Sequence, residues 1–553
     1  MDTLLSLIEN EKWQEALDCF MEHLDNNELS EELCVFGATI LEHFEDTENR
    51  FDIIVTGLKI NPNNYELYLL LGNYYASTDN PYKALICYEN ALFYSRKQNQ
   101  ADDALVIEEL YQNYTDSTGI TLRKTTILIL DDGNQSGIEL LKESIHSTCP
   151  EGSYTITEVK VDKNRISAIN DAVRKADPDT DLLLLSCDVV LTSNALFTLK
   201  LGLYDKETVA SASAVSNNAS FNQIPLGDST NTISDAALYA LKNNVPEAFP
   251  YESKCAIDMS FVLIKADAVG KLFPMDEAFA SEEFTGINLG LSAIEHGYEN
   301  YVCWNSYVFR QIRLDVHKRN LLLQNSEALL LKKKWGFSPE YYMNTRTDLI
   351  KMINRDQEDP LDILEVGAGL GSTLARVKHD FPNSTVRGIE IVQPVAEFAS
   401  KYSDMRCTNI ETYEFPETEM YDYIMFGDVL EHLIDPFSLV DRLKKNLKPG
   451  GCILASIPNI MNANVIYELL HGNFAYQDSG ILDRTHLRFF TKNEVVKLFS
   501  TRGYSIERLA GTAHPLESTE VHKDFFEKLL TIDGIADKNE FETIQYLVCA
   551  KKI

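Results

Sequence analysis

The chain has 553 residues, of which 44% are hydrophobic and 10% aromatic, the composition of a folded protein that is too long for a single hydrophobic core. Lys and Arg number 50 against 84 Asp and Glu, so the formal net charge at pH 7 is -34. A surface this acidic repels nucleic acids and anionic membranes and argues against both as partners, although a local basic pocket could still bind a small phosphorylated ligand.

Targeting and membrane signals are not visible in the sequence. The first residues, MDTLLSLIENEKWQEAL, contain no basic leader, and the longest apolar stretch, LLLLSCDVVL, is too short to cross a bilayer. The ten cysteines are scattered singly, without CxxC pairs or metal-ligand spacing. These features predict reduced thiols and a cytoplasmic protein with no membrane span.

Residues 1–118 carry an almost entirely helical pattern with an internal repeat. In NPNNYELYLLLGNYYASTDNPYKALICYENALFYS, large residues occur at Tyr68, Leu71, Tyr75 and Tyr88, and small residues at Gly72, Ala84 and Ala91. Ala16 and Phe20 fall in the same register, since Ala16 lies 68 residues before Ala84, or two periods of about 34. The pattern resembles about three tetratricopeptide repeats. The middle repeat is degenerate and ends at Pro62. A generic helical bundle is the alternative.

That resemblance implies a segment that docks a protein partner. Small residues in such repeats let paired helices approach closely, and large residues fill the remaining gap. Nothing in residues 1–118 indicates catalysis.

Residues 124–312 alternate between strands and helices. The predicted strands are KTTILILDDG, SYTITEVKV and TDLLLLSCDVVL, and the predicted helices are IELLKESIH and RISAINDAVRKA. This order predicts an α/β domain with a parallel sheet that helices cover on both faces.

This middle segment resembles the inverting glycosyltransferases of GT-A fold, of the large family-two type. The resemblance places Asp131 and Asp132 near a nucleotide, Asn170 in a characteristic helix, and Asp188 at the metal motif. It implies a nucleotide sugar with Mn2+ or Mg2+, because a divalent cation neutralises the charge of the leaving diphosphate. The usual second carboxylate of the motif is replaced here by Ser186.

A second departure concerns the acid that would act as base toward the acceptor. In SEEFTGINLGLSAIEHGY the expected acidic pair aligns with Thr285 and Gly286, whereas Glu282 and Glu283 lie close by. Two hypotheses follow: an active transferase with Glu283 as its relocated catalytic acid, or a degenerate domain that binds a sugar or nucleotide.

A helical linker is expected over residues 313–339, followed by a second α/β unit over 340–553. Its first strand enters a glycine-rich turn, DILEVGAGLGS, with the pattern E-x-G-x-G-x-G. This differs from the G-x-G-x-x-G of dinucleotide enzymes, and no Lys-Ser or Lys-Thr follows to cradle a triphosphate. The acidic Glu390 ends the next strand, where a ribose-binding acid is expected in either class of enzyme.

With YDYIMFGDVLEHLIDP and LKKNLKPGGCILASIPN downstream, the unit resembles class I S-adenosylmethionine (SAM)-dependent methyltransferases. The resemblance implies a Rossmann-like sheet of seven strands, closed by an antiparallel pair from YSIERLAG and FETIQYLVCAKK. The residues it implies for SAM are Glu365, Gly367, Gly369, Gly371, Glu390, Ile391, Asn409, Asp428 and Val429. Of these, Asn409 stands where an Asp often meets the adenine amino group.

The candidates for methyl-transfer chemistry are Glu431, His432 and His486, with Arg488 nearby. Methyl transfer from a sulfonium depends mainly on positioning, but an oxygen acceptor also gains from a base that takes its proton. Our hypothesis is that His486 or His432 is this base. Each of the three residues could instead cap or pack local structure.

Together these predictions describe a cytoplasmic enzyme that modifies a protein-linked or surface glycan, with a methyltransferase and a glycosyltransferase-like domain in one chain. Its expected partners are a nucleotide sugar, a glycan or glycoprotein acceptor and a protein bound by the helical repeats. One alternative is a protein N- or O-methyltransferase with an inert sugar-binding domain. Another is a scaffold that only binds its ligands.

Overall fold

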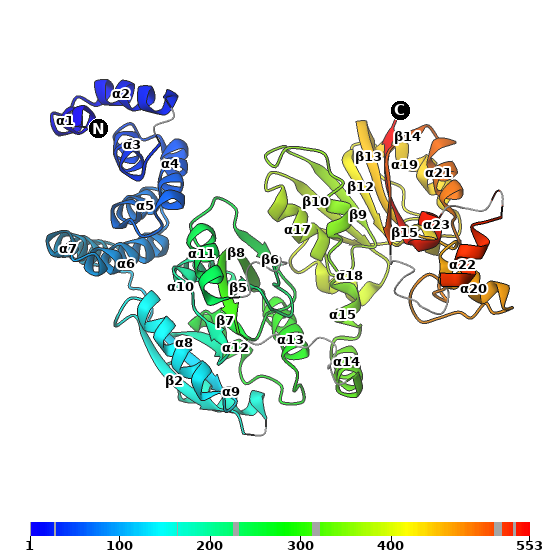
Figure 1. Cartoon of the computed structure of the whole chain (residues 1–553), viewed down its shortest axis with the longest axis horizontal. Helices are drawn as coiled ribbons and strands as arrows, with labels where there is room; N and C mark the ends of the chain where they lie inside the picture. The colour runs from blue at the N-terminus through cyan, green and yellow to red at the C-terminus, as the bar shows by residue number, and fades with distance from the viewer. Residues whose placement is uncertain are drawn as a thin grey trace. The chain divides into compact units, whose positions relative to one another are not determined.

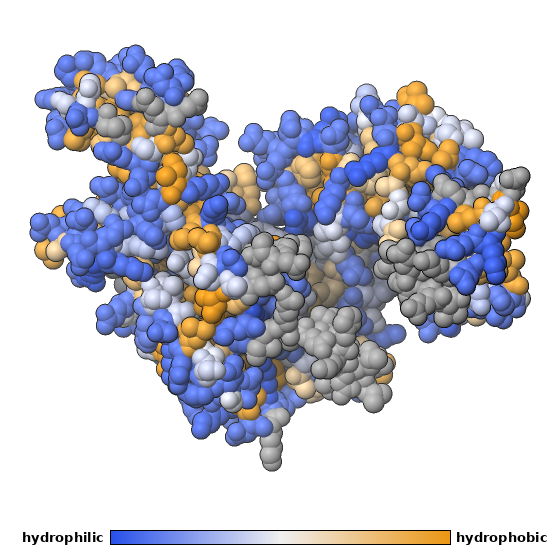
Figure 2. Space-filling view, viewed as in Figure 1, coloured by the Kyte–Doolittle hydropathy of each residue, from blue (hydrophilic) through white to orange (hydrophobic). Residues whose placement is uncertain are grey.

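The computed structural model describes residues 2–26, 29–162, 164–224, 232–311, 321–513, 523–532, 534 and 538–553. It divides into two compact units, Met1–Leu331 and Lys332–Ile553 (Figure 1). Figure 2 shows a mostly hydrophilic surface on which hydrophobic residues are exposed in small groups. No helix in the described ranges is long and apolar enough to span a membrane.

Unit 1 begins with helices that pack in chain order. They are α1 (Asp2–Glu9), α2 (Trp13–Asp25), α3 (Glu31–His43), α4 (Thr47–Ile60), α5 (Tyr65–Ser77), α6 (Pro81–Lys97) and α7 (Ala101–Thr118). In α5, a Cβ added to Gly72 would lie 2.3 Å from the ring of Tyr88 in α6, and Ala84 and Ala91 are fully buried. The repeat pattern therefore marks close helix contacts, and membership of the tetratricopeptide family stays a prediction.

A mixed sheet follows. Its strands are β1 (Thr125–Asp131), β2 (Tyr154–Lys160), β3 (Asp181–Ser186), β4 (Val189–Val190), β5 (Val209–Ser216), β6 (Tyr251–Ser253), β7 (Phe261–Ile264) and β8 (Glu299–Arg310). They lie in the order β2-β1-β3-β7-β5-β8-β4, with β6 paired to β8. The prediction of a parallel sheet is wrong in part, because β7 runs antiparallel to β3 and β5. Hydrophobic runs identify buried strands, but the connections set their direction.

The predicted single strand TDLLLLSCDVVL is two strands. β3 ends at Ser186, the chain turns at Cys187 and Asp188, and β4 pairs antiparallel with the end of β8. Both turn residues are held by side chains distant in sequence, since Cys187 Sγ donates to Asp132 and Asp188 pairs with Arg310.

Helices cover both faces of this sheet, as predicted. On one face α8 (Gln135–Thr148) and α10 (Ala195–Leu203) contribute Ile138 and Leu199 to the core. The helices on the other face are α9 (Arg165–Lys175), α12 (Ala266–Leu272) and α13 (Glu282–Glu295). The remaining helix of the region, α11 (Ile233–Asn243), packs through Ala236 and Ala240 against β8.

The helical segment and the sheet of unit 1 share one core, joined at the start of α10. The Asn194 Oδ1 accepts from the Tyr94 hydroxyl at 2.9 Å, and its Nδ2 donates to the Tyr68 hydroxyl at 2.9 Å. Phe197 of α10 packs into the same cluster as the α5 and α6 side chains. The two segments that the sequence separates at about residue 118 therefore form a single compact unit.

Helix α14 (Leu321–Trp335) leads into unit 2, within the segment predicted as a helical linker; residues 312–320 lie outside the described ranges. The strands of unit 2 are β9 (Asp362–Val366), β10 (Thr385–Glu390), β11 (Met405–Cys407), β12 (Tyr421–Gly427), β13 (Leu447–Pro458), β14 (Tyr504–Ala513) and β15 (Thr543–Lys552). Their order is β11-β10-β9-β12-β13-β15-β14, and β15 is antiparallel to both of its neighbours. The predicted sheet of seven strands with a closing antiparallel pair is confirmed.

Alternate residues of the central strands face opposite cores. Leu364 and Phe426 pack with α19 (Pro436–Leu443) and α21 (Lys492–Ser500), whereas Ile363 and Met425 pack with α16 (Thr347–Ile350) and α17 (Ser372–Asp380). The other helices of unit 2 are α15 (Pro339–Tyr342), α18 (Gln393–Ala399), α20 (Ala463–Leu470), α22 (Lys523–Leu529) and α23 (Lys538–Glu542).

The Pro-Gly-Gly sequence in LKKNLKPGGCILASIPN does not form a turn between a helix and a strand. Residues 449–451 lie within β13, where the pairing with β12 shifts register between Tyr421 and Tyr423. Gly450 has a φ of 76°, so residues 449–451 form an irregularity inside a continuous strand.

The close approach of α5 and α6 makes a testable prediction. We expect Gly72→Ala to lower the free energy of unfolding by about 1–3 kcal/mol, since the new methyl group meets the Tyr88 ring. Gly270→Ala in α12 is the matched control: no atom lies within 4 Å of its Cβ position, and we expect about 0.5–1 kcal/mol of stabilisation. Chemical denaturation of the full chain measures both; equal effects would contradict the packing described.

Candidate functional site

The glycine-rich turn after β9 uses a backbone that side chains would strain. Gly367, Gly369 and Gly371 have φ values of 74°, 54° and 76°. A Cβ on Gly369 would lie 2.5 Å from the Tyr342 carbonyl oxygen, which accepts from the Leu370 N–H at 2.8 Å. A Cβ on Gly367 would lie 2.6 Å from Val429. The turn is therefore bare backbone, which allows a ligand to approach closely.

Glu390, at the end of β10, shapes this turn from the neighbouring strand. Its Oε2 accepts from the Gly369 N–H at 3.0 Å, and its Oε1 accepts from the Val392 N–H at 2.9 Å. A carboxylate offers about four acceptor positions, so two remain for ribose hydroxyls. Beside it, Ile391 is 63% exposed and available to cover a nucleoside.

Asn409 lies in the loop after β11 and is exposed. Its Oδ1 accepts from the Glu411 N–H at 2.9 Å and closes the loop. The carbonyl expected to meet the adenine amino group is thus already part of the local turn.

Glu365 is a buried carboxyl at the base of the turn. It is 3% exposed, burial raises its pKa to about 8, and its Oε2 has no hydrogen-bond partner among the described residues. An unsatisfied buried acceptor is costly, and the ammonium group of a bound amino acid would satisfy it. The bare turn, Glu390 and Glu365 therefore fit SAM, which has an amino acid end, a ribose and no phosphate.

Asp428 follows β12 with a φ of 55°, which an aspartate tolerates better than most residues. Its Oδ1 accepts from the Ser456 hydroxyl at 2.6 Å, and its Oδ2 accepts from Arg346 at 2.7 Å. Arg346 also pairs with Asp348 at 2.7 Å. Arg346 and the Tyr342 carbonyl belong to no recognisable spacing, so the sequence does not predict them as part of this site.

The three candidate catalytic residues lie together. Glu431 and His432 are in the 3-10 turn η3 (Leu430–His432), and the Glu431 carbonyl accepts from the N–H groups of Leu487 and Arg488 at 2.8 and 3.0 Å. This ties the loop carrying His486 to η3. The imidazoles of His432 and His486 have ring centroids 4.7 Å apart, and His486 Nε2 lies 3.9 Å from Glu431 Oε1.

Burial dominates the electrostatics of this cluster. It raises the pKa of the Glu431 carboxyl well above its usual range, with the nearby charge of Asp428 adding to the effect. Burial, together with His486, lowers the pKa of His432. His432 is therefore neutral at pH 7 and offers a lone pair for chemistry.

In unit 1 the predicted metal ligand Asp188 forms an ion pair with a buried arginine. Its two oxygens accept from Arg310 Nε and Nη2 at 2.9 and 3.1 Å, and the two side chains are 6% and 5% exposed. A divalent cation would have to displace this guanidinium. The residues present do not fit the predicted Mn2+ or Mg2+ site.

The other predicted residues of unit 1 are also engaged. Asp131 Oδ1 accepts from the Gly133 N–H, and Asp132 Oδ1 accepts from Cys187 Sγ at 2.9 Å. Asn170 is buried and pairs with both backbone groups of Met275, at 2.7 and 2.9 Å. These contacts stabilise the loops at the ends of the strands.

The acids near the acceptor position form part of the same charge network. Glu282 pairs with Arg165 at 2.6 Å and lies 3.9 Å from Arg310. Glu283 is the neighbouring residue in the first turn of α13, and Thr285 and Gly286 are buried further along that helix. Thr285 Oγ1 has no hydrogen-bond partner among the described residues. A general base at Glu282 would first have to leave its arginine.

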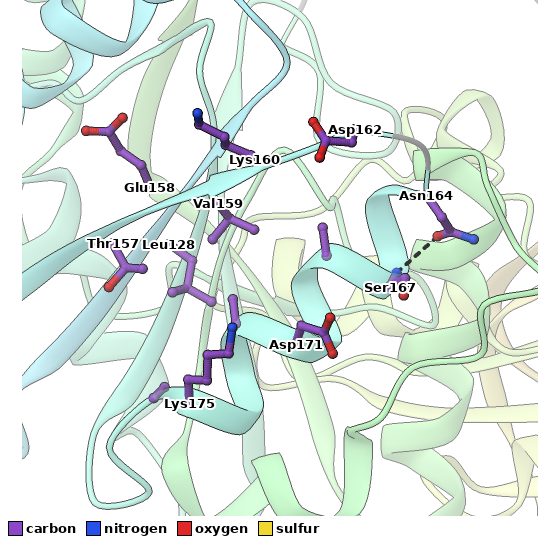
Figure 3. Close-up of a pocket in the computed structure, with 13 residues that line it drawn as sticks. Leu128, Thr157, Glu158, Val159, Lys160, Asp162, Asn164, Ser167, Asp171 and Lys175 are labelled. Atoms are coloured by element: carbon purple, nitrogen blue, oxygen red, sulfur yellow. Dashed lines mark hydrogen bonds between the residues drawn. The ribbon is translucent and has the colours of Figure 1, made fainter.

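A groove of about 520 Å³ lies between β2 and α9 (Figure 3). Its polar rim includes Lys160, Asp162 and Asn164, with Asp171 and Lys175 on α9. Figure 3 shows Asn164 turned back to the start of α9, where its Oδ1 accepts from the Ser167 N–H at 3.0 Å. None of the predicted nucleotide-sugar residues lines this groove.

Comparison with known proteins places a methyltransferase domain in unit 2. The family described as "Methyltransferase domain" matches residues 338–509. The malonyl-[acyl-carrier protein] O-methyltransferase of Halalkalibacterium halodurans is 29% identical over 153 residues, 25% of this chain and 55% of that protein. This chain thus spans little more than half of that relative's length.

Two other similar proteins are also methyltransferases. The tRNA (guanine-N(7)-)-methyltransferase of Chromobacterium violaceum is 27% identical over 209 residues, 34% of this chain and 87% of the relative. A solved SAM-dependent methyltransferase from Archaeoglobus fulgidus aligns with 40% of this chain and 99% of its own, at 18% identity and a TM-score of 0.28.

The turn geometry predicts the effect of one substitution. Gly369→Ala should weaken S-adenosylhomocysteine binding at least tenfold, because the methyl group meets the Tyr342 carbonyl and the left-handed backbone costs a further 1–2 kcal/mol, roughly. Gly472→Ala, with a φ of 82° and open space around it, carries the backbone strain alone and should bind normally. Calorimetric titration of both variants decides; loss of binding in neither would remove the turn from the site.

The Asp188–Arg310 pair makes a second prediction. In the presence of EDTA, Asp188→Asn should lower stability by about 3–5 kcal/mol, because it leaves a buried guanidinium unpaired. Asp171→Asn breaks an exposed pair with Arg174 and should change stability by less than about 1 kcal/mol. An Asp188→Asn variant as stable as Asp171→Asn in EDTA, together with loss of a bound Mn2+ on Asp188→Asn, would instead indicate a metal site at Asp188.

Proposed function

We propose that the SAM-dependent methyltransferase domain of this chain transfers a methyl group to a hydroxyl of a glycan, and that unit 1 recognises the sugar. The observation that supports an oxygen acceptor most directly is the cluster of Glu431, His432 and His486 beside Asp428. A neutral amine needs little beyond alignment, whereas a hydroxyl must lose its proton as it is methylated. The relative from H. halodurans is also named an O-methyltransferase.

In this proposal the residues of unit 2 bind, orient and desolvate the reactants. The glycine turn and Glu365 hold the amino acid end of SAM, and Glu390 holds its ribose. Bound SAM supplies a methyl group already activated by its sulfonium. Asp428, fixed by Arg346 and Ser456, lines the methionine end.

The acceptor hydroxyl would lie toward His432 and His486. His486 Nδ1 lies 2.9 Å from the Ile481 carbonyl, which fixes the proton on Nδ1 and leaves the lone pair on Nε2. Burial keeps His432 neutral as well. The cluster therefore offers nitrogen lone pairs toward a hydroxyl in a water-poor environment.

For unit 1 we propose sugar or nucleotide binding rather than glycosyl transfer. The ion pair of Asp188 with Arg310 occupies the acid that metal binding would need, and Glu282, one of the two acids near the acceptor position, is paired with Arg165. The polar groove between β2 and α9 offers both donors and acceptors to hydroxyl groups.

A polypeptide acceptor is the second candidate. Helix α7 exposes Leu105 and Val106, at 66% and 65%, on the helical segment that the repeat pattern assigns to protein docking.

The ten cysteines are all free, and most are buried, which supports a reducing, cytoplasmic setting for either acceptor.

The nature of the product tests the proposal. We expect the full chain, incubated with methyl-labelled SAM and a panel of glycans, glycopeptides and unglycosylated peptides, to label sugar hydroxyls, as read by mass spectrometry. Asp428→Ala should lose this labelling, whereas Asp441→Asn, which breaks a surface pair with Lys444, should retain it. Label on peptide amides, amines or carboxyls, with sugars unlabelled, would favour the polypeptide acceptor and contradict the glycan.

A further inference from the structure

The residues after β12 bring together three side chains of the kinds that bind metal ions. Among the described residues, Glu431, His432 and His486 form a group whose ligand atoms all lie within 4.8 Å of one another. Ligands bonded to one cation at about 2.0–2.2 Å are roughly 3–3.5 Å apart. The three ligand atoms would therefore have to move closer together on binding an ion.

Glu431 gives the independent sign that something is bound here. Its side chain is 1% exposed, and neither carboxyl oxygen has a hydrogen-bond partner among the described residues. His486 Nε2 lies 3.9 Å from Glu431 Oε1, too far for a hydrogen bond. A buried carboxyl with both oxygens unused is costly unless a cation or a donor satisfies it.

The two imidazoles present the lone pairs that a cation needs. His486 Nδ1 lies 2.9 Å from the Ile481 carbonyl, and His432 Nδ1 lies 3.2 Å from the Thr485 carbonyl. The Thr485 hydroxyl, 3.1 Å from His432 Nδ1, donates its proton to Asp483, and a carbonyl only accepts, so each Nδ1 donates and the lone pair of each neutral ring is on Nε2. Outer contacts of this kind fix the tautomer of metal-binding histidines.

The neighbouring acids Asp428 and Asp483 are not members of this group, and each is held by other contacts. Asp428 accepts from Arg346 and Ser456, and Asp483 Oδ1 accepts from the backbone and hydroxyl of Thr485 at 2.7 and 2.6 Å. They add negative potential without filling the site. The backbone bonds from Leu487 and Arg488 to the Glu431 carbonyl hold the two halves of the cluster in register.

We propose that Glu431, His432 and His486 bind one divalent transition-metal ion, and that this ion binds the acceptor hydroxyl of the methyl transfer. The second half of the proposal rests on the proposed function of unit 2. Three protein ligands leave coordination positions open for the hydroxyl. The role expected of either histidine as a free base then passes to the ion, since both lone pairs are used in coordination.

The step balances with the groups named. The ion lowers the pKa of the bound hydroxyl, whose proton leaves to water. The oxygen lone pair forms the new C–O bond as the C–S bond of SAM breaks, and that electron pair stays on sulfur to give S-adenosylhomocysteine. No electrons are exchanged with the metal.

The ligand set also selects the ion. Two imidazoles and one carboxylate favour Zn2+, Mn2+ or Fe2+ over Mg2+, which prefers oxygen ligands. Mn2+ is the convenient probe, because its paramagnetic signal reports binding without any assay of activity.

The experiment titrates the chelator-treated full chain with Mn2+, followed by electron paramagnetic resonance, and repeats the titration with Mg2+ as competitor. We expect one Mn2+ per chain at this site, weakened at least tenfold by Glu431→Gln, His432→Ala or His486→Ala, with Mg2+ competing poorly. His471→Ala, which removes an exposed histidine of the same unit, should leave Mn2+ binding unchanged. Glu431→Gln keeps the size and shape of the side chain, so its thermal unfolding in EDTA should stay close to that of the wild type.

The outcomes separate this inference from the proposed function. Absence of Mn2+ and Zn2+ binding, or binding that none of the three substitutions weakens, overturns the metal site even if methyl transfer to a hydroxyl is observed. Bound Mn2+ that the substitutions weaken supports the site even if sugars are not methylated. In an active preparation, loss of transfer on chelation and its recovery with Mn2+ in the wild type, but not in Glu431→Gln, supports the role of the ion in the reaction.

Discussion

The left-handed backbone of the turn at Gly367, Gly369 and Gly371 is the constraint on which the functional site depends. Each of these positions would cost a residue with a side chain roughly 1–2 kcal/mol in backbone strain, before any clash with Tyr342 or Val429. Glu390 and the Tyr342 carbonyl hold the turn from two directions. What results is a fixed cradle of backbone beside two buried carboxyls, which suits a ligand with an amino group and a ribose.

In unit 1 two acids near the ends of the strands are paired with arginines and are not left without a partner. They are neutralised within the protein: Asp188 by Arg310, and Glu282 by Arg165. A buried pair of this kind is stable only while both partners remain, so these acids are poorly placed to exchange an arginine for a metal ion. Glu431 differs from these acids, because its carboxyl oxygens have no hydrogen-bond partner among the described residues. These two acids of unit 1 are already neutralised, whereas Glu431 can still accept a cation or a hydrogen-bond donor.

Much of unit 2 could be predicted from local sequence. The glycine spacing, the acid at Glu390 and the hydrophobic strand runs specify the turn and the sheet because each depends on neighbouring residues. The errors have a common cause. The break at Asp188 and the partners of Asp428 depend on contacts across 122 residues to Arg310 and 82 residues to Arg346. The direction of β7 is set by its pairing with β3 and β5, and no local pattern encodes any of these contacts. The grouping of His486 with Glu431 is likewise set by the fold, although both motifs were visible in the sequence.

Binding of a SAM-type ligand by the turn after β9 can be measured by calorimetry of the unmodified full chain. We expect a single-site isotherm with S-adenosylhomocysteine and no measurable heat with NAD or ATP. Saturable binding of NAD or ATP, with none of S-adenosylhomocysteine, would contradict it.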